Sequence, residues 1–323
     1  FIDLFAGIGG MRLGFQKLGC RCVFSSEIDP HAQKTYLANF GTKPFGDIYK
    51  LKDKDIPDHD ILLAGFPCQP FSRAGISKRK NLKRAYGFQD KDQGDLFFNI
   101  LDILNTKKPR AFVLENVQNL KNHQGGKLLN KILKELRKNY YVPEPQVLDA
   151  QDFGLAQRRR RIFIVGFLNF NGDFKFPNPT NKTTKVKDFL DLYPPKKYII
   201  SDLLWKSHKK RKLRNKKAGK GFGYKLTYPT DKATITISAR YYKDGGECLL
   251  YRGENKNPRK LTPREVFRLQ GFPESFKFSV SDLQAYKQAG NAVPINVVEK
   301  VCSSVINYLE KNQKNISLIK KAS

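Results

Sequence analysis

The feature that most constrains the fold is a repeated alternation of short apolar runs with segments of helical spacing in the first half of the chain. This alternation is typical of βαβ units and predicts an α/β domain built on a parallel sheet. The expected strands are residues 1–5, 21–25, 60–64, 111–114 and 162–166, with a further short strand that ends near residues 46–48. The expected helices are residues 11–18, 30–39, 94–106 and 127–139.

The composition changes near residue 170, where glycine, proline and asparagine predict a linker. The second region carries a lysine-rich stretch and short strands, and a helix is expected after Thr262 because Thr262, Pro263 and Glu265 form a helix-start signal. A last amphipathic helix is expected over residues 296–310. A chain of 323 residues accommodates one large and one smaller domain. No apolar run reaches the roughly 18 residues of a membrane span, so no membrane partner is expected.

Positive charge is concentrated in the second region. The chain has 60 Lys and Arg against 30 Asp and Glu, a net charge of +30, and residues 185–220 hold 13 of the basic residues and 3 of the acidic ones. Such an excess favours a polyanionic partner, most simply nucleic acid. The alternative is a generally lysine-rich composition, which the uneven distribution disfavours.

Cys68 follows the expected strand 60–64 and lies between Pro67 and Pro70, which stiffen its backbone. Open α/β sheets place their chemistry at the carboxyl ends of strands, so Cys68 is a candidate nucleophile. The alternative is a small buried cysteine beside a core strand. The five cysteines form no close C-x-x-C pair, which favours a reducing cytoplasm, and the four scattered histidines predict no metal site.

A glycine turn, Gly7-Ile8-Gly9-Gly10, separates the first strand from the first helix and would let a cofactor approach the backbone. Glu27 follows the second strand, 20 residues after Gly7, and could accept hydrogen bonds from ribose hydroxyls. Asp47 could accept one from an adenine amino group. NAD would fit the same pattern, and solvated loop carboxylates are the simpler alternative for both acids.

Two further groups follow strands of the same sheet. Glu115 ends the strand 111–114 and could protonate or bond a ring heteroatom near Cys68. Arg159 and Arg161 precede the strand 162–166, and alternation along a strand would put both on one face, where they could hold a base oxygen, a loop or phosphates. The alternatives are a solvated carboxylate and a solvated basic run.

In order along the chain, six stretches resemble the motifs of bacterial DNA (cytosine-5) methyltransferases. They are residues 1–10, 65–72, 115–117, 157–161, 259–265 and 288–294. The resemblance covers nearly the whole chain apart from the variable target-recognition segment. It implies a doubly wound Rossmann-like domain that binds S-adenosylmethionine and a smaller, mostly β target-recognition domain. The implied boundaries are a catalytic domain 1–178, a small domain 179–278 and a C-terminal segment 279–323 that returns to the catalytic domain.

The same resemblance assigns roles to individual residues. Cys68 would attack carbon 6 of a flipped-out cytosine, Glu115 would stabilise the protonated ring nitrogen 3, and Arg161 would bind the oxygen on carbon 2, with Arg159 as a fourth catalytic residue. Phe5 would stack near the adenine and Asn291 would help to tie the domains together. The implied cofactor-binding residues are Phe5, Ala6, Gly7, Gly9, Gly10, Glu27, Ile28, Asp47, Ile48, Pro67 and Asn291.

Duplex DNA is the expected partner. The basic loop after Cys68 would close over phosphates. Residues 219–224 and 238–245 are similar to recognition segments of Dcm-like enzymes, and Arg240 could read a guanine edge; ordinary β-hairpin structure is the alternative for this segment. The expected DNA contacts are Ser72, Arg79, Lys80, Arg240, Tyr241, Tyr242 and Lys243. We expect a monomeric bacterial enzyme in the cytoplasm that protects DNA from a cognate endonuclease. An RNA cytosine methyltransferase and a DNA-binding relative without catalysis are the alternatives.

Overall fold

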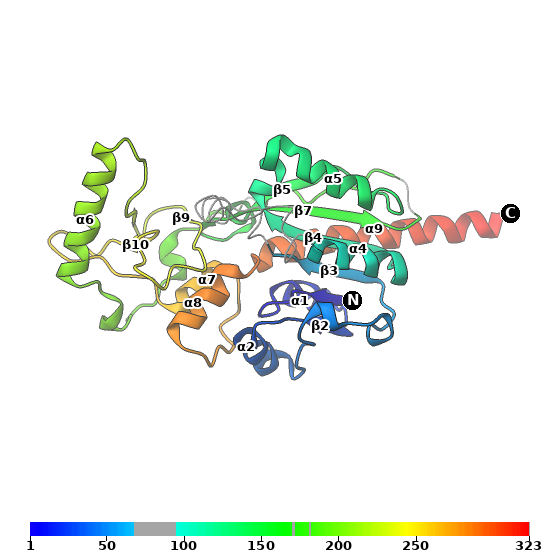
Figure 1. The fold of residues 1–323 in the computed structure, drawn as a ribbon, viewed down its shortest axis with the longest axis horizontal. Coiled ribbons are helices and arrows are strands. Elements are labelled where there is room, and N and C mark those ends of the chain that lie inside the picture. Colours follow the sequence, from blue (N-terminus) through cyan, green and yellow to red (C-terminus); the bar gives the residue numbers. More distant parts are fainter. Residues whose placement is uncertain (68–94, 170–171, 181, 323) are drawn as a thin grey trace. The chain divides into compact units, whose positions relative to one another are not determined.

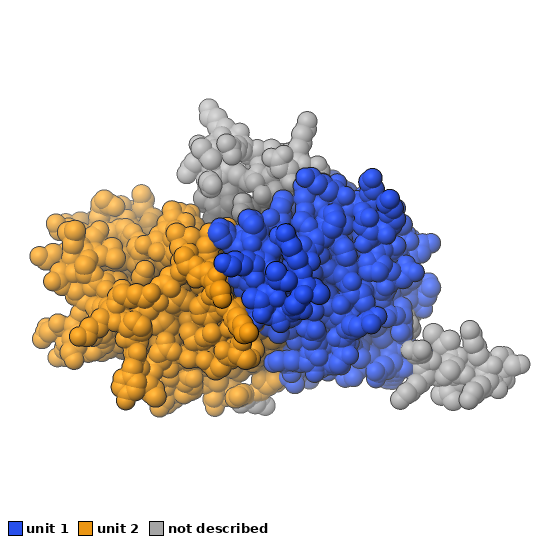
Figure 2. Space-filling model, turned by 90° about the horizontal axis from the view of Figure 1, so that it is seen from below, with its two compact units in different colours: residues 1–148, 160–178, 297–323 blue, residues 149–159, 179–296 orange. Residues whose placement is uncertain are grey.

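The computed structural model describes residues 1–67, 95–169, 172–180 and 182–322 (Figure 1). They belong to two compact units (Figure 2). The first unit comprises residues 1–148, 160–178 and 297–323, and the second comprises residues 149–159 and 179–296. The chain therefore passes between the units four times, and the second unit is an insertion into the α/β pattern of the first.

A six-stranded sheet forms the centre of the first unit, in the order β2-β1-β3-β4-β7-β5. β1 is parallel to β2 and β3, and β3 is parallel to β4, but β7 runs antiparallel to β4. The strands are β1 (Ile2–Leu4), β2 (Phe24–Ser26), β3 (Ile61–Gly65), β4 (Ala111–Val117), β5 (Gln146–Asp149) and β7 (Arg160–Phe167). The expected parallel sheet is thus mixed. The chain reaches β7 from the second unit and not through a crossover helix, so a parallel direction is not imposed on it.

Helices cover both faces of this sheet, as expected for a doubly wound domain. Alternate residues of β1, such as Ile2 and Leu4, share one apolar cluster with buried residues of α4 and α5. On the other face the ring of Phe1 lies 5.0 Å from that of Phe15 in α1, and Phe167 lies 4.4 Å from Tyr308 in α9. The helices of this unit are α1 (Gly10–Gln16), α2 (Pro30–Phe40), α4 (Asp95–Lys107), α5 (Lys127–Leu136) and α9 (Ile295–Ala322), which begins at the boundary between the units.

The short strand expected to end near residues 46–48 is reduced to a single parallel bridge between Ser26 and Phe45. Asp47 ends it by capping a short 3₁₀ helix, Ile48–Lys50, through a 3.0 Å bond from the amide of Tyr49. The backbone groups of this segment are satisfied by the cap, so the ladder does not extend.

The second unit contains much less strand than the predicted mostly β domain. In the part of the chain that the structure describes, its strands are two-residue pairs, while its helices are longer. The strands are β6 (Gln157–Arg158) with β9 (Thr234–Ile235) and β8 (Leu226–Thr227) with β10 (Leu249–Leu250), and the helices are α6 (Asp202–Lys217), α7 (Pro263–Leu269) and α8 (Asp282–Asn291). Lysine and arginine are good helix formers, so the lysine-rich stretch folds as a helix, whereas the glycines around residues 219–246 interrupt strands.

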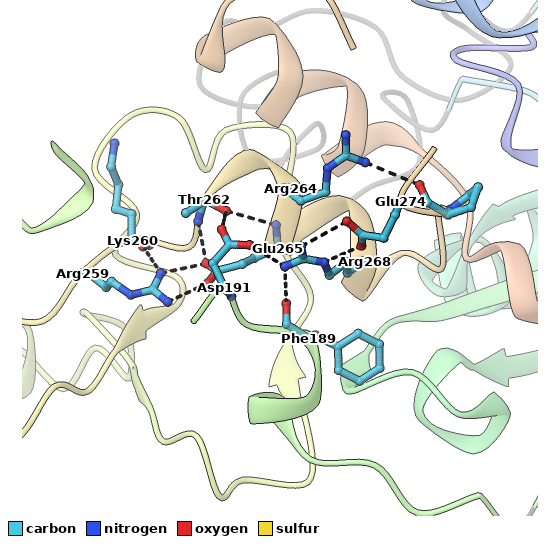
Figure 3. Close-up of polar contacts among 10 residues, drawn as sticks. Phe189, Asp191, Arg259, Lys260, Thr262, Arg264, Glu265, Arg268 and Glu274 are labelled. Atoms are coloured by element: carbon cyan, nitrogen blue, oxygen red, sulfur yellow. Dashed lines mark hydrogen bonds and ion pairs between the residues drawn. The ribbon is translucent and has the colours of Figure 1, made fainter. Parts of the chain in front are cut away.

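A buried ion pair lies in the core of the second unit (Figure 3). The guanidinium of Arg259 donates two bonds of 2.7 and 2.6 Å to the carboxylate of Glu265, whose side chain is fully buried. The expected start of α7 is confirmed, because Thr262 and Glu265 form a reciprocal capping box with Pro263 in the first turn. Asp191 connects this site to Arg268 through a 2.6 Å ion pair.

The unit boundaries differ from the expected domains at residues 149–159 and 279–296, which both belong to the second unit. The buried side chain of Gln157 donates a 3.0 Å bond to the carbonyl of Leu269 at the end of α7. The side chain of Gln270 likewise donates a 3.0 Å bond to a carbonyl oxygen of α8. These buried polar contacts link distant segments, and no local sequence pattern reveals them.

Candidate active site

The glycine turn connects β1 to α1 through left-handed backbone conformations. Phe5, Gly7 and Gly9 have φ values of 55°, 57° and 85°. A Cβ at Gly9 would lie 2.2 Å from the ring of Phe40, whereas a Cβ at Gly7 would have nothing within 4 Å. The turn is therefore closely packed on one side and open on the other, and the open side exposes the backbone to a ligand.

Glu27 lies beside this turn because β1 and β2 are neighbours. Its Oε2 accepts a 2.8 Å bond from the amide of Gly7 and its Oε1 accepts a 2.8 Å bond from the amide of Asp29. The amide of Ala6 adds a 2.9 Å bond to the carbonyl of Ser26. Burial raises the pKa of Glu27, and the two amide donors work in the opposite direction. The carboxylate is thus fixed against the open side of the turn.

The other expected cofactor residues differ in exposure. Ile28 is 68% exposed next to Glu27, and Phe5 is half-buried. Ile48 is buried in the same apolar cluster as Ile2 and Leu4, so it packs in the core and is not open to a ligand. Asp47 is half-buried and points its Oδ1 at the amide of Tyr49.

A buried carboxylate that sequence reasoning missed lies in β1, directly before the turn. Asp3 is fully buried, and neither of its oxygens has a hydrogen-bond partner among the described residues. Burial raises the pKa of Asp3 to about 7, although the positive charge of Arg12 lowers it. Arg12 stacks over the ring of Phe40 at 4.3 Å and donates a 3.0 Å bond to the hydroxyl of Tyr36. An acid inside the apolar run of residues 1–5 was the signal for this group.

Glu115 and Arg161 form a nearly buried ion pair at the end of β4. The Nε of Arg161 lies 3.0 Å from Oε1 of Glu115, and their side chains are 13% and 9% exposed. Gly65, the last residue of β3, pairs with Glu115 across the ladder, and the side chain of Asn116 donates a 3.4 Å bond to the carbonyl of Phe66. The pair therefore lies where β3 ends, three residues before Cys68.

Arg159 has a different environment from the expected one. It is 1% exposed, and its guanidinium donates to the backbone carbonyls of Ile237, Gly290 and Ala292 at 3.2, 2.9 and 2.6 Å. The prediction that Arg159 and Arg161 share a face of one strand is wrong. The chain leaves β6 before Arg159 and starts β7 after it, so the two arginines belong to different units. The described contacts of Arg159 hold backbone segments of the second unit together.

The family follows from the comparison with known proteins. The model of the C-5 cytosine-specific DNA methylases matches residues 1–307 of this chain. The chain belongs to this family.

Relatives of the C-5 cytosine-specific DNA methylase support this assignment along nearly the whole chain. Type II methyltransferase M.DsaV of Dactylococcopsis salina is 51% identical, over 96% of this chain and 86% of the relative. Type II methyltransferase M.NlaX of Neisseria lactamica is 53% identical, over 94% of this chain and 95% of the relative. The crystal structure of S. pombe Dnmt2 methyltransferase has a similar fold, with a TM-score of 0.76 at 22% identity over 95% of this chain and 98% of that chain.

C-5 cytosine-specific DNA methylases use S-adenosylmethionine, and the residues present fit it. The open side of the glycine turn leaves room for the ligand, and Glu27 is already oriented there by two amides. The exposed Ile28 offers an apolar surface beside that carboxylate. An anchored acid next to an apolar side chain suits a ribose followed by an adenine.

Several expected site residues of this methylase lie outside the described residues. Cys68, Ser72, Arg79 and Lys80 lie outside the described residues, while Pro67 is half-buried at their border. Asn291 is exposed as the last residue of α8.

The prediction that Tyr241 contacts DNA is wrong for this methylase, because the side chain is buried. Tyr241 is 1% exposed, and its hydroxyl donates a 2.7 Å bond to the carbonyl of Cys248 and accepts a 2.8 Å bond from the amide of Leu261. Its ring belongs to the core of the second unit. Arg240 and Lys243 are exposed, and Tyr242 is half-buried.

Within the described ranges of the methylase, no group of three or more His, Cys, Asp or Glu residues could hold a metal ion. The described helices also include none with the length and apolar character needed to cross a bilayer.

Proposed function

We propose that this chain methylates carbon 5 of a flipped-out cytosine within a short double-stranded DNA sequence, through a covalent adduct with Cys68. The observation that carries the proposal is the Glu115–Arg161 pair, which is nearly buried at the end of β4, in register with the strand end that leads to Cys68. A carboxyl group and a guanidinium held 3.0 Å apart can bond adjacent ring positions of one pyrimidine.

Each residue has a defined task in this proposal. The thiolate of Cys68 adds to carbon 6, and the electron pair of the 5,6 double bond makes carbon 5 nucleophilic. Glu115 holds the proton at ring nitrogen 3, and Arg161 binds the oxygen on carbon 2, so both stabilise charge that builds up on the ring. After carbon 5 has gained the methyl group, loss of its proton restores the double bond and expels the Cys68 thiolate.

S-adenosylmethionine, when bound, supplies the electrophilic methyl group. Glu27 would hold the ribose hydroxyls, Ile28 and Phe5 would contact the adenine, and the backbone around Gly7 would line the rest of the ligand. Asp47 would accept a bond from the adenine amino group. The two amide bonds to Glu27 support this assignment, since they fix the carboxylate before the ligand arrives.

Duplex DNA is the proposed substrate, and the net charge of +30 suits such a polyanion. Within a duplex the target base must leave the stack before it can react. Flipping a base out requires a few kcal/mol, which phosphate and base contacts offset. We also propose that the enzyme acts as a monomer in the bacterial cytoplasm and protects DNA from a cognate restriction endonuclease. The names of the relatives M.DsaV and M.NlaX, both Type II methyltransferases, support this context.

The test measures transfer of a labelled methyl group from S-adenosylmethionine to duplex DNA and to tRNA, followed by bisulfite sequencing of DNA from cells that express the protein. We expect 5-methylcytosine at one short DNA sequence and none on tRNA. Glu115→Gln should abolish it, while Glu144→Gln, a change at an exposed carboxylate, should not. Methylation of tRNA without methylation of DNA would support the RNA alternative, and folded protein without either activity would refute the proposal.

A further inference from the structure

The helix α6 of the second unit carries an unusually dense positive charge. Among its 16 residues are eight Lys or Arg and a single acid, Asp202 in the first turn. Seven of the eight basic side chains are exposed, and Arg211 is half-buried. The seven exposed residues are Lys206, Lys209, Lys210, Lys212, Arg214, Lys216 and Lys217.

These charges repel one another along the helix. Lys206 and Lys210, Lys210 and Arg214, and Lys212 and Lys216 are each four residues apart, and like charges at this spacing destabilise a helix by a few tenths of a kcal/mol per pair. Among the residues that the structure describes, Arg211 is the cation of α6 that has a carboxylate partner. A polyanion laid along the exposed side would remove this repulsion.

Aromatic rings lie among these lysines. The Nζ of Lys212 lies 4.3 Å from the ring of Tyr224, and that of Lys209 lies 5.3 Å from the ring of Trp205. The ring of Phe222 is 66% exposed, and its carbonyl accepts a 2.9 Å bond from the side chain of Asn215 in α6. Basic side chains thus lie beside one ring of α6 and beside rings of the segment that follows it, and basic clusters interleaved with aromatic rings are typical of surfaces that bind nucleic acid.

The inner side of α6 is linked to residues 238–247, which we call the recognition loop. His208 is buried, and its Nε2 lies 3.3 Å from the carbonyl oxygen of Asp244. Arg211 donates a 2.8 Å bond to Nδ1 of His208 and a 2.9 Å bond to Oδ2 of Asp244. The other oxygen of Asp244 accepts a 3.0 Å bond from the amide of Gly246. Because Nδ1 accepts a bond, His208 is neutral and donates from Nε2 to the loop.

Hydrogen bonds within the recognition loop hold its first residues to Glu247 without a contribution from α6. The carboxylate of Glu247 accepts a bond from the hydroxyl of Ser238 and a 2.8 Å bond from its amide, and the amide of Arg240 donates a 3.1 Å bond to that hydroxyl. Arg240 and Lys243 remain exposed on this frame. The contacts of α6 therefore hold the Asp244–Gly246 end of the loop, next to the exposed Lys243, while Tyr241 is anchored in the core.

We propose that α6 binds the sugar–phosphate backbone of duplex DNA beside the recognition sequence, and that the His208–Arg211–Asp244 link makes this docking set the position of the Asp244 end of the recognition loop, next to Lys243. The proposal rests on the proposed function, since it assumes a DNA substrate. The exposed lysines supply affinity that is independent of sequence, and Arg211 is a positioning residue for the loop that reads sequence.

Two sets of variants separate these roles in the full-length protein. The triple variant Lys206→Gln, Lys210→Gln and Lys217→Gln removes exposed charge. Its matched control is Lys34→Gln, Lys54→Gln and Lys134→Gln, three exposed lysines of the first unit. Arg211→Lys keeps the charge of α6, but an ammonium lacks the planar fork that reaches His208 and Asp244 together.

The measurement is the affinity for duplexes with and without the methylated sequence, across a series of salt concentrations. For the triple variant we expect weaker binding to both duplexes and a salt slope flatter by up to roughly 3, with discrimination between them unchanged. For Arg211→Lys we expect an unchanged slope and a loss of discrimination of roughly tenfold. The control variant should behave like the wild type, and thermal unfolding confirms that every variant is folded.

Each failure has a distinct meaning. An unchanged salt slope in the triple variant would overturn the docking of α6, and unchanged discrimination in a folded Arg211→Lys variant would overturn the link. If the triple variant lost affinity for an RNA duplex but kept the wild-type affinity for DNA, the proposal would also be overturned. If the wild-type protein neither binds nor methylates DNA, the proposed function itself has failed, and these outcomes therefore stay distinguishable.

Discussion

Replacement of Asp3 by asparagine tests what it costs to bury an ionised carboxylate directly before the glycine turn. Asp3 is fully buried, its oxygens have no hydrogen-bond partner among the described residues, and its pKa is raised from 3.8 to about 7 by burial. A native pKa above the unfolded one means that the folded state binds the proton more tightly. Protonation of Asp3 therefore contributes stability that is fully present below about pH 4 and is lost as the pH rises to about 7.

The magnitude follows from that difference. One pKa unit corresponds to about 1.4 kcal/mol, so ionised Asp3 destabilises the fold by about 4 kcal/mol above pH 7. Asparagine has nearly the same shape and no charge. We expect the advantage of Asp3→Asn over the wild type to grow by about 3 kcal/mol between pH 5 and pH 8.

The assay is urea unfolding of the cofactor-free protein at several pH values, with free energies compared at each pH. Asp58→Asn serves as the control, since the side chain of Asp58 is fully exposed, and it should show no such trend. If the difference between Asp3→Asn and the wild type stays constant from pH 5 to pH 8, the carboxylate does not titrate in this range, and the argument from burial is refuted.

Three further variants test the site and the fold. Cys68→Ser should still bind S-adenosylmethionine and duplex DNA in binding assays but lose methyl transfer, because a serine hydroxyl is far less ionised than a thiol. Arg161→Lys should lower kcat by roughly 10²-fold or more with little change in DNA affinity, since an ammonium cannot hold Glu115 and a base oxygen in one plane; unchanged kcat would contradict this. Glu265→Gln leaves Arg259 buried without its counter-charge and should lower the free energy of unfolding by about 3–5 kcal/mol in denaturant titrations.

Much of the first unit could be predicted because its elements are encoded locally. Short continuous apolar runs and helices with period 3.6 predicted the order of most of its strands and helices. In the second unit, the cap at Thr262 likewise predicted the start of α7. The missed elements lacked such signals. β5 has a half-polar composition, and α6 has no apolar stripe because charged side chains surround it.

The sequence by itself determined the chemistry of this methylase, because motifs place a thiol, a carboxylate, an arginine and a glycine turn at strand ends in a fixed order. Tertiary structure decided which of these groups meet. Arg161 pairs with Glu115, whereas Arg159 binds backbone carbonyls of the second unit and Tyr241 is enclosed in its core. The reason is physical: local spacing sets the face of a strand on which a side chain lies, but contacts between distant segments decide where that strand ends and what covers it.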